Sequence, residues 1–354
     1  MSKLDILFVH PNASEKIYQG LAKNNSAIEP PIWAGMLANH VRSRGFSTAI
    51  LDCEAERLDW ESSAKTISDF DAKVICFVVY GQQPSASSQN MTGAVGIANL
   101  VKQLVNTTIV FVGGHVAALP EEVLQEDCVD IVLLNEGVYA ISNLLSTDLS
   151  LEQLRNCKGI GYKDNGKACL NEPERIVPKA NLAEDLPGIA WDLLPSFSKY
   201  RTAPWHSWSN GSEQYSFAAL YTSLGCPYKC SFCMINIINR TSNLPMVTSA
   251  DSNMFRWWDP EFIIKQFDYF AENNIKNVKI ADELFVLNPN HFIKICNMII
   301  ERGYDFNIWA YSRVDTCKPQ YLDTLKKAGI NWLGLGIENP NQSLRQEIHK
   351  DHFV

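Results

Sequence analysis

Residues 220–236 read LYTSLGCPYKCSFCMIN and contain a C-x3-C-x2-C array formed by Cys226, Cys230 and Cys233. The apolar run before the array, 217–221, predicts a short strand, and a glycine and a proline around the first cysteine then turn the chain into a loop. A structural zinc ion usually takes four protein ligands, and a simple [4Fe–4S] cluster takes four cysteines. Three thiolates on a four-iron cluster would therefore leave one iron open to a substrate or cofactor. Three free cysteines, or a zinc site completed by a distant histidine, are the alternatives.

The composition of the whole chain excludes several classes of protein. The chain has 354 residues, enough for two domains, with 46% hydrophobic and 20% charged residues, as in ordinary globular proteins. Its net charge of −8 argues against a nucleic-acid partner bound through a basic face. No apolar stretch approaches the roughly 20 residues of a membrane span, and the start MSKLDILFVH lacks the layout of a signal peptide. Cysteines outside the array stand singly, as in a reducing compartment, so we predict a cytoplasmic protein without a membrane partner.

Residues 1–146 alternate short apolar runs with helical patterns and predict a doubly wound, flavodoxin-like α/β domain. Strands are expected at 4–9, 48–52, 74–79, 109–113 and 130–134, and helices at 31–44, 87–104, 120–125 and 138–145. In such sheets ligands bind beyond the carboxyl ends of the strands. The residues there that would meet a large polar ligand are Gly81, Gln82, Ser85, Ser88, Gly113, Gly114, His115, Glu136 and Gly137.

Residues 147–215 are expected to be a connector. The stretch 159–170 predicts a β-hairpin, since its Asn165-Gly166 pair is a strong turn signal. The following stretch, 186–208, is rich in proline and tryptophan and shows little periodicity. It is either an ordered linker or a lining of the space between two cofactors.

Residues 216–354 repeat a strand, loop and helix pattern, with strands expected at 217–221, 277–281, 306–311 and 332–337. Prolines after capping residues start several of the helices, and the last helix is expected at 342–350. In parallel barrels chemistry takes place at the carboxyl ends of strands. The charged residues at these ends are Asp282, Glu283, Arg313, Asp315 and Glu338.

The cysteine array, with Phe232 directly before its last cysteine, resembles the radical S-adenosylmethionine (radical SAM) superfamily. The resemblance implies a [4Fe–4S] cluster on the three cysteines, with SAM bound to the open iron and cleaved by one electron. It also implies SAM contacts. Phe232 would lie beside SAM, Asp282 or Glu283 would receive the amino group, Arg313 the carboxylate and Glu338 the ribose hydroxyls. Alternatively, these charges only pair with one another. The family has a six-stranded partial barrel, so the chain is expected to be truncated within this domain.

The N-terminal domain resembles the cobalamin-binding domain of B12-dependent radical SAM proteins. The residues that carry this resemblance are Pro30-Pro31, Gly113-Gly114-His115 followed by Pro120-Glu121, and Asp130 with Asn135-Glu136-Gly137. Asn135 departs from the usual G-E-G. No D-x-H-x-x-G motif is present, so cobalamin is expected to bind without a histidine ligand from this domain. The nine strand-end residues named above would be its contacts. The alternative is a domain of this fold without a ligand.

Together the two resemblances imply a cobalamin-dependent radical SAM enzyme that methylates an unactivated carbon. Its substrate would be a small molecule or a peptide, and its electron donor a flavodoxin or ferredoxin. A cyclase or rearrangement enzyme of the same family, and a non-catalytic iron–sulfur or cobalamin-binding protein, are the alternatives.

Overall fold

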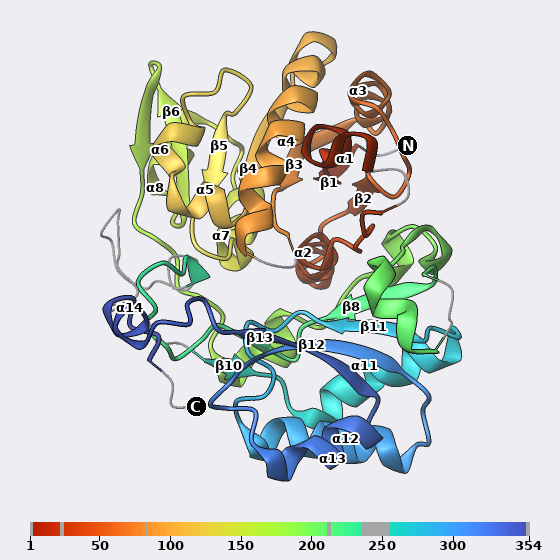
Figure 1. Ribbon diagram of the computed structural model, residues 1–354. Coiled ribbons are helices and arrows are strands. Elements are labelled where there is room, and N and C mark those ends of the chain that lie inside the picture. Colours follow the sequence, from red (N-terminus) through yellow and green to blue (C-terminus); the bar gives the residue numbers. More distant parts are fainter. Residues whose placement is uncertain (1–2, 22–24, 82–83, 211–213, 236–254, 352–354) are drawn as a thin grey trace. The chain divides into compact units, whose positions relative to one another are not determined.

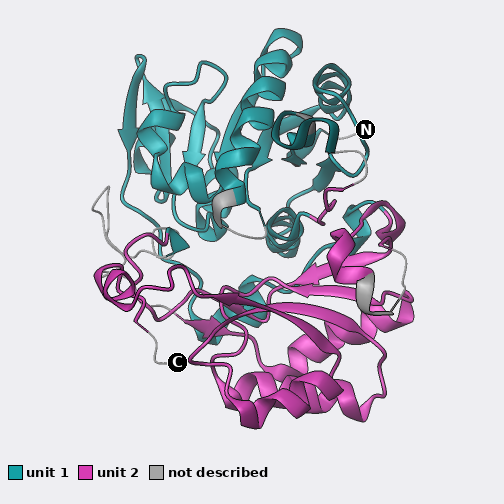
Figure 2. Ribbon diagram, viewed as in Figure 1, with its two compact units in different colours: residues 1–23, 31–195, 234–252 teal, residues 24–30, 196–233, 253–354 magenta. Residues whose placement is uncertain are grey.

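The computed structural model describes residues 3–21, 25–81, 84–210, 214–235 and 255–351 (Figure 1). The chain forms two compact units (Figure 2). Unit 1 consists of Met1–Lys23, Pro31–Pro195 and Met234–Ser252, and unit 2 of Asn24–Pro30, Ser196–Cys233 and Asn253–Val354. None of the helices in the described ranges has the length and apolar character needed to span a bilayer.

Unit 1 contains a seven-stranded sheet in the order β2-β1-β3-β4-β5-β6-β7. Its first five strands are parallel and confirm the predicted flavodoxin-like order. They are β1 (Leu4–His10), β2 (Thr48–Asp52), β3 (Ala72–Val78), β4 (Thr108–Val112) and β5 (Ile131–Leu133). Successive side chains point to opposite faces. Leu7 and Val9 of β1 therefore join the core under two of the helices, while Phe8 is buried on the other face.

Helices cover both faces of this sheet. They are α1 (Ser14–Tyr18), α2 (Ile32–Ser43), α3 (Trp60–Asp69), α4 (Pro84–Leu104), α5 (Gly114–Ala118), α6 (Pro120–Val123), α7 (Val138–Leu145), α8 (Leu151–Asn156) and α9 (Leu182–Asp185). Helix α3 was not expected from the sequence, because its exposed face is polar and only Ala64 and Ile67 provide a buried apolar stripe. Asp59 starts this helix, with its carboxylate accepting a hydrogen bond from the Ser62 N–H at 2.8 Å.

The predicted hairpin is present as β6 (Ile160–Asp164) and β7 (Lys167–Leu170). Asn165 and Gly166 have φ values of 50° and 78°, as a tight hairpin turn requires. β6 pairs antiparallel with β5, so the hairpin extends the sheet of unit 1. The division of the chain at residues 146 and 215 stays a prediction. Short 3-10 helices follow, at Lys179–Asn181, Trp191–Leu193, Phe197–Lys199 and Pro204–Asn210.

Unit 2 contains a parallel four-stranded sheet in the order β13-β12-β11-β8. The strands are β8 (Phe217–Leu220), β11 (Asn277–Ile280), β12 (Asn307–Arg313) and β13 (Ile330–Gly336), and a ribbon of β9 (Ser223–Leu224) and β10 (Arg256–Trp257) accompanies them. The helices α11 (Pro260–Glu272), α12 (Pro289–Glu301) and α13 (Pro319–Lys327) each begin at proline and lie along one face of the sheet in Figure 1. The last helix, α14 (Gln342–Glu347), ends earlier than expected. The four predicted strand–helix repeats are confirmed.

A row of asparagines fixes the amino ends of three neighbouring strands in unit 2. The side-chain amide of Asn307 donates to Asn277 Oδ1, and that of Asn331 donates to Asn307 Oδ1, each at 2.9 Å. The Asn307 amide also donates to the His206 carbonyl at 2.6 Å. These groups satisfy one another at the amino end, whereas in parallel barrels chemistry takes place at the carboxyl ends.

Candidate active site

The three cysteines lie on the loop that follows β8 and β9, beyond the carboxyl end of the unit 2 sheet. Cys230 is 8% exposed, whereas Cys226 and Cys233 are partly exposed. The Cys233 N–H donates to the Cys230 carbonyl at 3.1 Å. Burial raises the pKa of Cys226 to about 12, and the two other cysteines act in the same direction, as expected for thiols that lie near one another.

The donor set on this loop fits a thiophilic metal centre, since it consists of thiols without competing carboxylates between them. Within the described ranges no three His, Cys, Asp or Glu side chains are already gathered closely enough to hold a metal ion. The assignment of the cysteines as metal ligands therefore stays a prediction, based on their spacing and on their place at the strand ends.

Two buried acidic residues at the end of β11 support the start of the cysteine loop. The Asp282 carboxylate accepts hydrogen bonds from the Thr222 N–H, the Thr222 hydroxyl and the Ser223 hydroxyl, each at 2.6 Å. Glu283 Oε2 accepts from the Gly225 N–H at 3.0 Å. Burial raises the pKa of Asp282 to about 6 and that of Glu283 to about 7. Both carboxyls thus hold the backbone that leads into the array.

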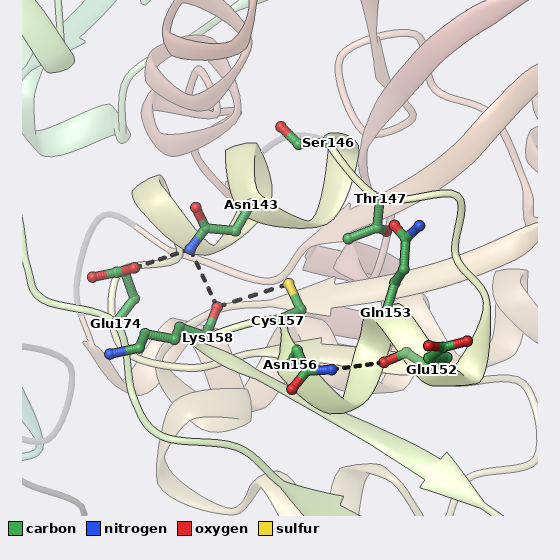
Figure 3. A pocket seen from close by; sticks show the side chains of 9 residues that line it. All are labelled: Asn143, Ser146, Thr147, Glu152, Gln153, Asn156, Cys157, Lys158 and Glu174. Atoms are coloured by element: carbon green, nitrogen blue, oxygen red, sulfur yellow. Dashed lines mark hydrogen bonds between the residues drawn. The ribbon is translucent and has the colours of Figure 1, made fainter.

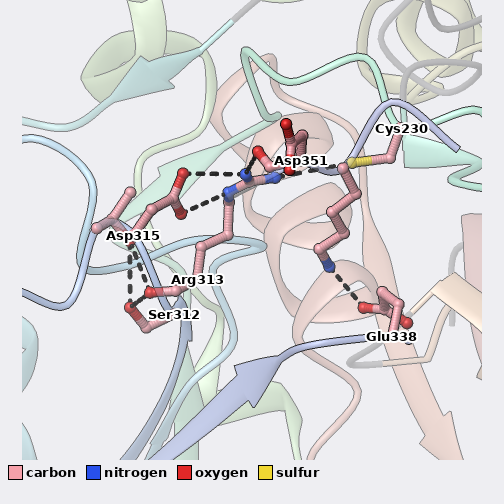
Figure 4. Close-up of polar contacts among 8 residues, drawn as sticks. Cys230, Ser312, Arg313, Asp315, Glu338 and Asp351 are labelled. Carbon is pink, nitrogen blue, oxygen red and sulfur yellow. Dashed lines mark hydrogen bonds and ion pairs between the residues drawn. The ribbon is translucent and has the colours of Figure 1, made fainter. Parts of the chain in front are cut away.

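Arg313, at the end of β12, reaches the central cysteine (Figure 4). Its Nη1 lies 3.9 Å from Cys230 Sγ, and its Nε and Nη2 donate to the Asp315 carboxylate at 2.9 and 3.0 Å. The guanidinium also stacks on Tyr228, 3.9 Å from the ring centroid. Burial raises the pKa of the Cys230 thiol, while the cations of Lys350 and Arg313 act in the opposite direction.

The remaining predicted SAM residues, Phe232 and Glu338, both lie near the side chain of Lys350. Lys350 Nζ lies 2.5 Å from Glu338 Oε1 and 5.6 Å from the centroid of the Phe232 ring, which is 54% exposed. The Ser231 N–H donates to the Ile348 carbonyl at 3.0 Å, so the segment after α14 contacts the cysteine loop. These contacts bring the predicted residues together around the loop, but whether they bind SAM stays a prediction.

Sequence reasoning missed several residues that build this site, namely Thr222, Ser223, Tyr228 and Lys350. The hydroxyls directly after the β8 run, and the tyrosine inside the array, were visible signals. Lys350 gave no signal, because its contact with Glu338 depends on the turn that follows β13.

The predicted cobalamin residues in unit 1 fall into two groups. Near the carboxyl ends of β3 and β4, Ser88 Oγ and His115 Nδ1 lie 3.0 Å apart, and the His115 N–H donates to Ser87 Oγ at 2.9 Å. Glu136 is 2% exposed and accepts a hydrogen bond from the Val177 N–H at 2.5 Å, so it braces the end of β5 from inside. Of Ser85 only the backbone, in α4, is described, and Gln82 lies outside the described residues.

The glycines of this group permit close packing. A Cβ on Gly113 would lie 2.4 Å from the Val79 carbonyl oxygen, and a Cβ on Gly81 would lie 2.1 Å from the Ala86 side chain. Gly137, beside Glu136, has a φ of 78°, and Gly114 is the first residue of α5. The loops thus need glycine for their own packing, and Gly113, Gly114 and Gly137 are buried.

We expect Gly113→Ala to destabilise unit 1 by about 2–3 kcal/mol, because the new methyl group collides with backbone at the end of β3. Hydrogen exchange of the β3 and β4 amides measures this effect. Gly20→Ala is the matched control, since nothing lies within 4 Å of its Cβ position. Equal protection of β3 and β4 in the two variants would contradict the packing role of Gly113.

Unit 1 also contains a cavity of about 620 Å³ beside α7 and α8 (Figure 3). Its lining is polar and consists of Asn143, Ser146, Thr147, Glu152, Gln153, Asn156, Cys157, Lys158 and Glu174. None of the predicted cobalamin residues is among them. The Asn143 side chain donates to Glu174 Oε2 at 2.9 Å, so part of this lining is already paired.

Comparisons with known proteins match both parts of the chain. Residues 19–145 match the model of the B12 binding domain, and residues 220–354 match that of the radical SAM superfamily. A protein of Pyrococcus horikoshii named "Uncharacterized methyltransferase PH0819" is 28% identical over 99% of this chain and 69% of its own length. The anaerobic magnesium-protoporphyrin IX monomethyl ester cyclase of Cereibacter sphaeroides is 21% identical over 99% of this chain and 53% of its own length.

Among solved structures, the radical S-adenosylmethionine methyltransferase TsrM from Kitasatospora setae, with cobalamin and a [4Fe-4S] cluster bound, has a TM-score of 0.68. It is 15% identical, and the alignment covers 100% of this chain and 63% of that one. At this identity the likeness shows the fold. Together with the two matched domain models, it confirms the expected succession of a doubly wound domain and a radical SAM domain. The chain spans only part of the length of the proteins that it matches.

Proposed function

We propose that this chain, which belongs to the radical SAM superfamily and carries a B12 binding domain before its radical SAM domain, acts in a cobalamin-dependent radical SAM methyltransferase. The observation that carries the proposal is the cysteine loop at the carboxyl ends of a parallel sheet. Relatives named methyltransferases support it. The proposed acceptor is an unactivated carbon of a small molecule or peptide.

In this proposal Cys226, Cys230 and Cys233 hold the [4Fe–4S] cluster. A three-cysteine cluster with an open iron supplies one-electron chemistry on SAM, and cobalamin supplies a carrier for a methyl group. Burial of Cys230 restricts water around that part of the loop. Glu283 and Asp282 position the loop through the Gly225 and Thr222 amides and, of the two, Glu283 is the better placed for the SAM amino group because it accepts fewer hydrogen bonds from the loop.

Phe232 and Glu338 are proposed to face SAM on the other side of the loop. The exposed Phe232 ring offers an apolar surface. The Glu338 carboxylate is proposed to accept hydrogen bonds from the ribose hydroxyls while it stays paired with Lys350. A flavodoxin or ferredoxin is the proposed electron donor, and the cytoplasm the proposed location.

Cobalamin is proposed to bind beyond the carboxyl ends of the unit 1 strands. The hydroxyl of Ser88 and the imidazole of His115 are polar groups there, and Gly81 and Gly113 allow the close packing that forms these strand ends, with Gly114 beside them. Gly137 allows the turn into α7, and the buried Glu136 carboxylate supports this turn by accepting a hydrogen bond from the Val177 N–H.

A cyclase is the second candidate function, because the magnesium-protoporphyrin IX monomethyl ester cyclase of Cereibacter sphaeroides aligns over nearly the whole chain. Methylation and cyclisation share the cleavage of SAM and differ in the fate of the methyl group. The experiment must therefore follow both.

The test is anaerobic purification and reconstitution of the full chain, followed by incubation with SAM and dithionite. We expect about four irons and one corrinoid per chain, and formation of 5′-deoxyadenosine. Label from methyl-labelled SAM should then appear on the corrinoid. Zinc without iron, or a loaded chain that leaves SAM intact, would contradict the proposal, and cleavage without any methyl transfer would favour the cyclase.

A further inference from the structure

Arg313 is held on all sides in unit 2. Its side chain is 7% exposed, and its Nε and Nη2 make a two-pronged contact with the Asp315 carboxylate. Nη2 also donates to the Asp351 carbonyl at 3.3 Å, and the Tyr228 ring covers one face of the guanidinium. A planar guanidinium in such a setting keeps a fixed orientation.

The fixed orientation determines which group the guanidinium N–H donors can hydrogen-bond. Two parallel N–H groups of arginine match a carboxylate well, but Asp315 already takes the Nε and Nη2 edge. The remaining nitrogen, Nη1, lies 3.9 Å from Cys230 Sγ (Figure 4). The structure thus directs the free donor at a cysteine of the array, whereas a SAM carboxylate would have to displace Asp315.

We propose that Arg313 is a positioning residue of the iron–sulfur centre, whose Nη1–H donates to Cys230 Sγ and favours the reduced cluster. The inference rests on the proposed function, since it needs a cluster on the cysteine array. Reduction places one electron, taken from an external donor such as dithionite, on the cluster, and no bond is formed or broken. The added negative charge spreads to the cysteine sulfurs. Hydrogen bonds to these sulfurs are known to set the reduction potential of such clusters.

Asp315 modulates this effect. Its carboxylate neutralises the guanidinium charge at long range, so the cluster experiences mainly the nearby N–H dipole of Arg313. Removing the Asp315 charge leaves the cation uncompensated beside Cys230. The two residues therefore act on the potential with opposite signs.

The experiment is an anaerobic redox titration of the reconstituted full chain, followed by electron paramagnetic resonance of the reduced cluster. Arg313→Gln is compared with Arg302→Gln, which removes the same charge from the Asp268 pair elsewhere in unit 2. For Arg313→Gln we expect unchanged iron content and about a tenfold lower ratio of reduced to oxidised cluster at a given potential, equal to about 59 mV more negative. SAM affinity should change by less than about twofold.

A second variant keeps the inference testable if Arg313→Gln does not fold. Asp315→Asn retains the arginine and should shift the potential to more positive values. If Asp315→Asn leaves the potential at the wild-type value, or Arg313→Gln matches Arg302→Gln, the inference is wrong. Weaker SAM binding by Arg313→Gln would then assign its guanidinium to the SAM carboxylate. A wild-type chain that takes up no four-iron cluster would instead refute the proposed function.

Discussion

Replacement of Cys226, Cys230 and Cys233 by alanine together is expected to reduce bound iron from about four atoms per chain to almost none, and to abolish SAM cleavage. The physical reason is that cysteine thiolates are the ligands that retain iron–sulfur clusters, and the array supplies them from a single loop. The expected effect on the corrinoid is small, because the proposed cobalamin residues belong to unit 1 while the array belongs to unit 2. Iron and corrinoid analysis of the anaerobically purified protein measures both outcomes.

The matched control is the double variant Cys169→Ala and Cys317→Ala. These two cysteines are also partly exposed but lie outside the array, so iron content should stay at the wild-type value. Loss of iron in the control, or retention of iron by the triple variant, would show that other residues hold the metal. Loss of both iron and corrinoid from the triple variant would show instead that the variant fails to fold.

The fold was predictable to a large extent because its local signals agree. Continuous apolar runs such as 109–113 are typical of strands covered on both faces, and prolines such as Pro289 mark helix starts. The prediction missed α3, whose sequence is mostly polar and whose buried apolar residues are only Ala64 and Ile67. It also treated the hairpin 160–170 as part of a connector, because no sequence signal tells which strand an edge hairpin will join.

The site was predictable only as a set of candidates. The cysteine spacing is local and can therefore be recognised in the sequence. The rule that chemistry takes place at strand ends selected Asp282, Glu283 and Arg313. The residues that these side chains contact could not be predicted from the sequence. Arg313 and Cys230 are 83 positions apart in the chain, and their contact follows from the register of β12 against its neighbours. The family resemblance implied a SAM carboxylate for Arg313, which stays a prediction, whereas its contact with Cys230 Sγ is visible only in the structure.

Asp282 is expected to be the most sensitive single position for the stability of unit 2. It is fully buried, and Asp282→Ala would leave the Thr222 N–H, the Thr222 hydroxyl and the Ser223 hydroxyl without their acceptor. We expect a loss of about 4 kcal/mol in the free energy of unfolding. Urea unfolding followed by tryptophan fluorescence measures it. Asp305→Ala is the control, since Asp305 makes only an exposed pair with Lys276, and its loss should cost less than about 1 kcal/mol.

The same residue predicts the direction of a pH effect. Burial raises the pKa of Asp282 from 3.8 to about 6, so the folded state binds this proton more tightly than the unfolded chain does. The protonated carboxyl stabilises the folded state fully below about pH 4. This stabilisation, about 3 kcal/mol, is lost as the pH rises through about 6. Asp282→Asn cannot titrate, and its unfolding free energy should therefore fall less than that of the wild type between about pH 4 and about pH 7. Parallel pH profiles for the two proteins would mean that the hydrogen bonds from Thr222 and Ser223 outweigh the burial and keep Asp282 charged throughout this range, and the cysteine loop would then be anchored by a fixed anion.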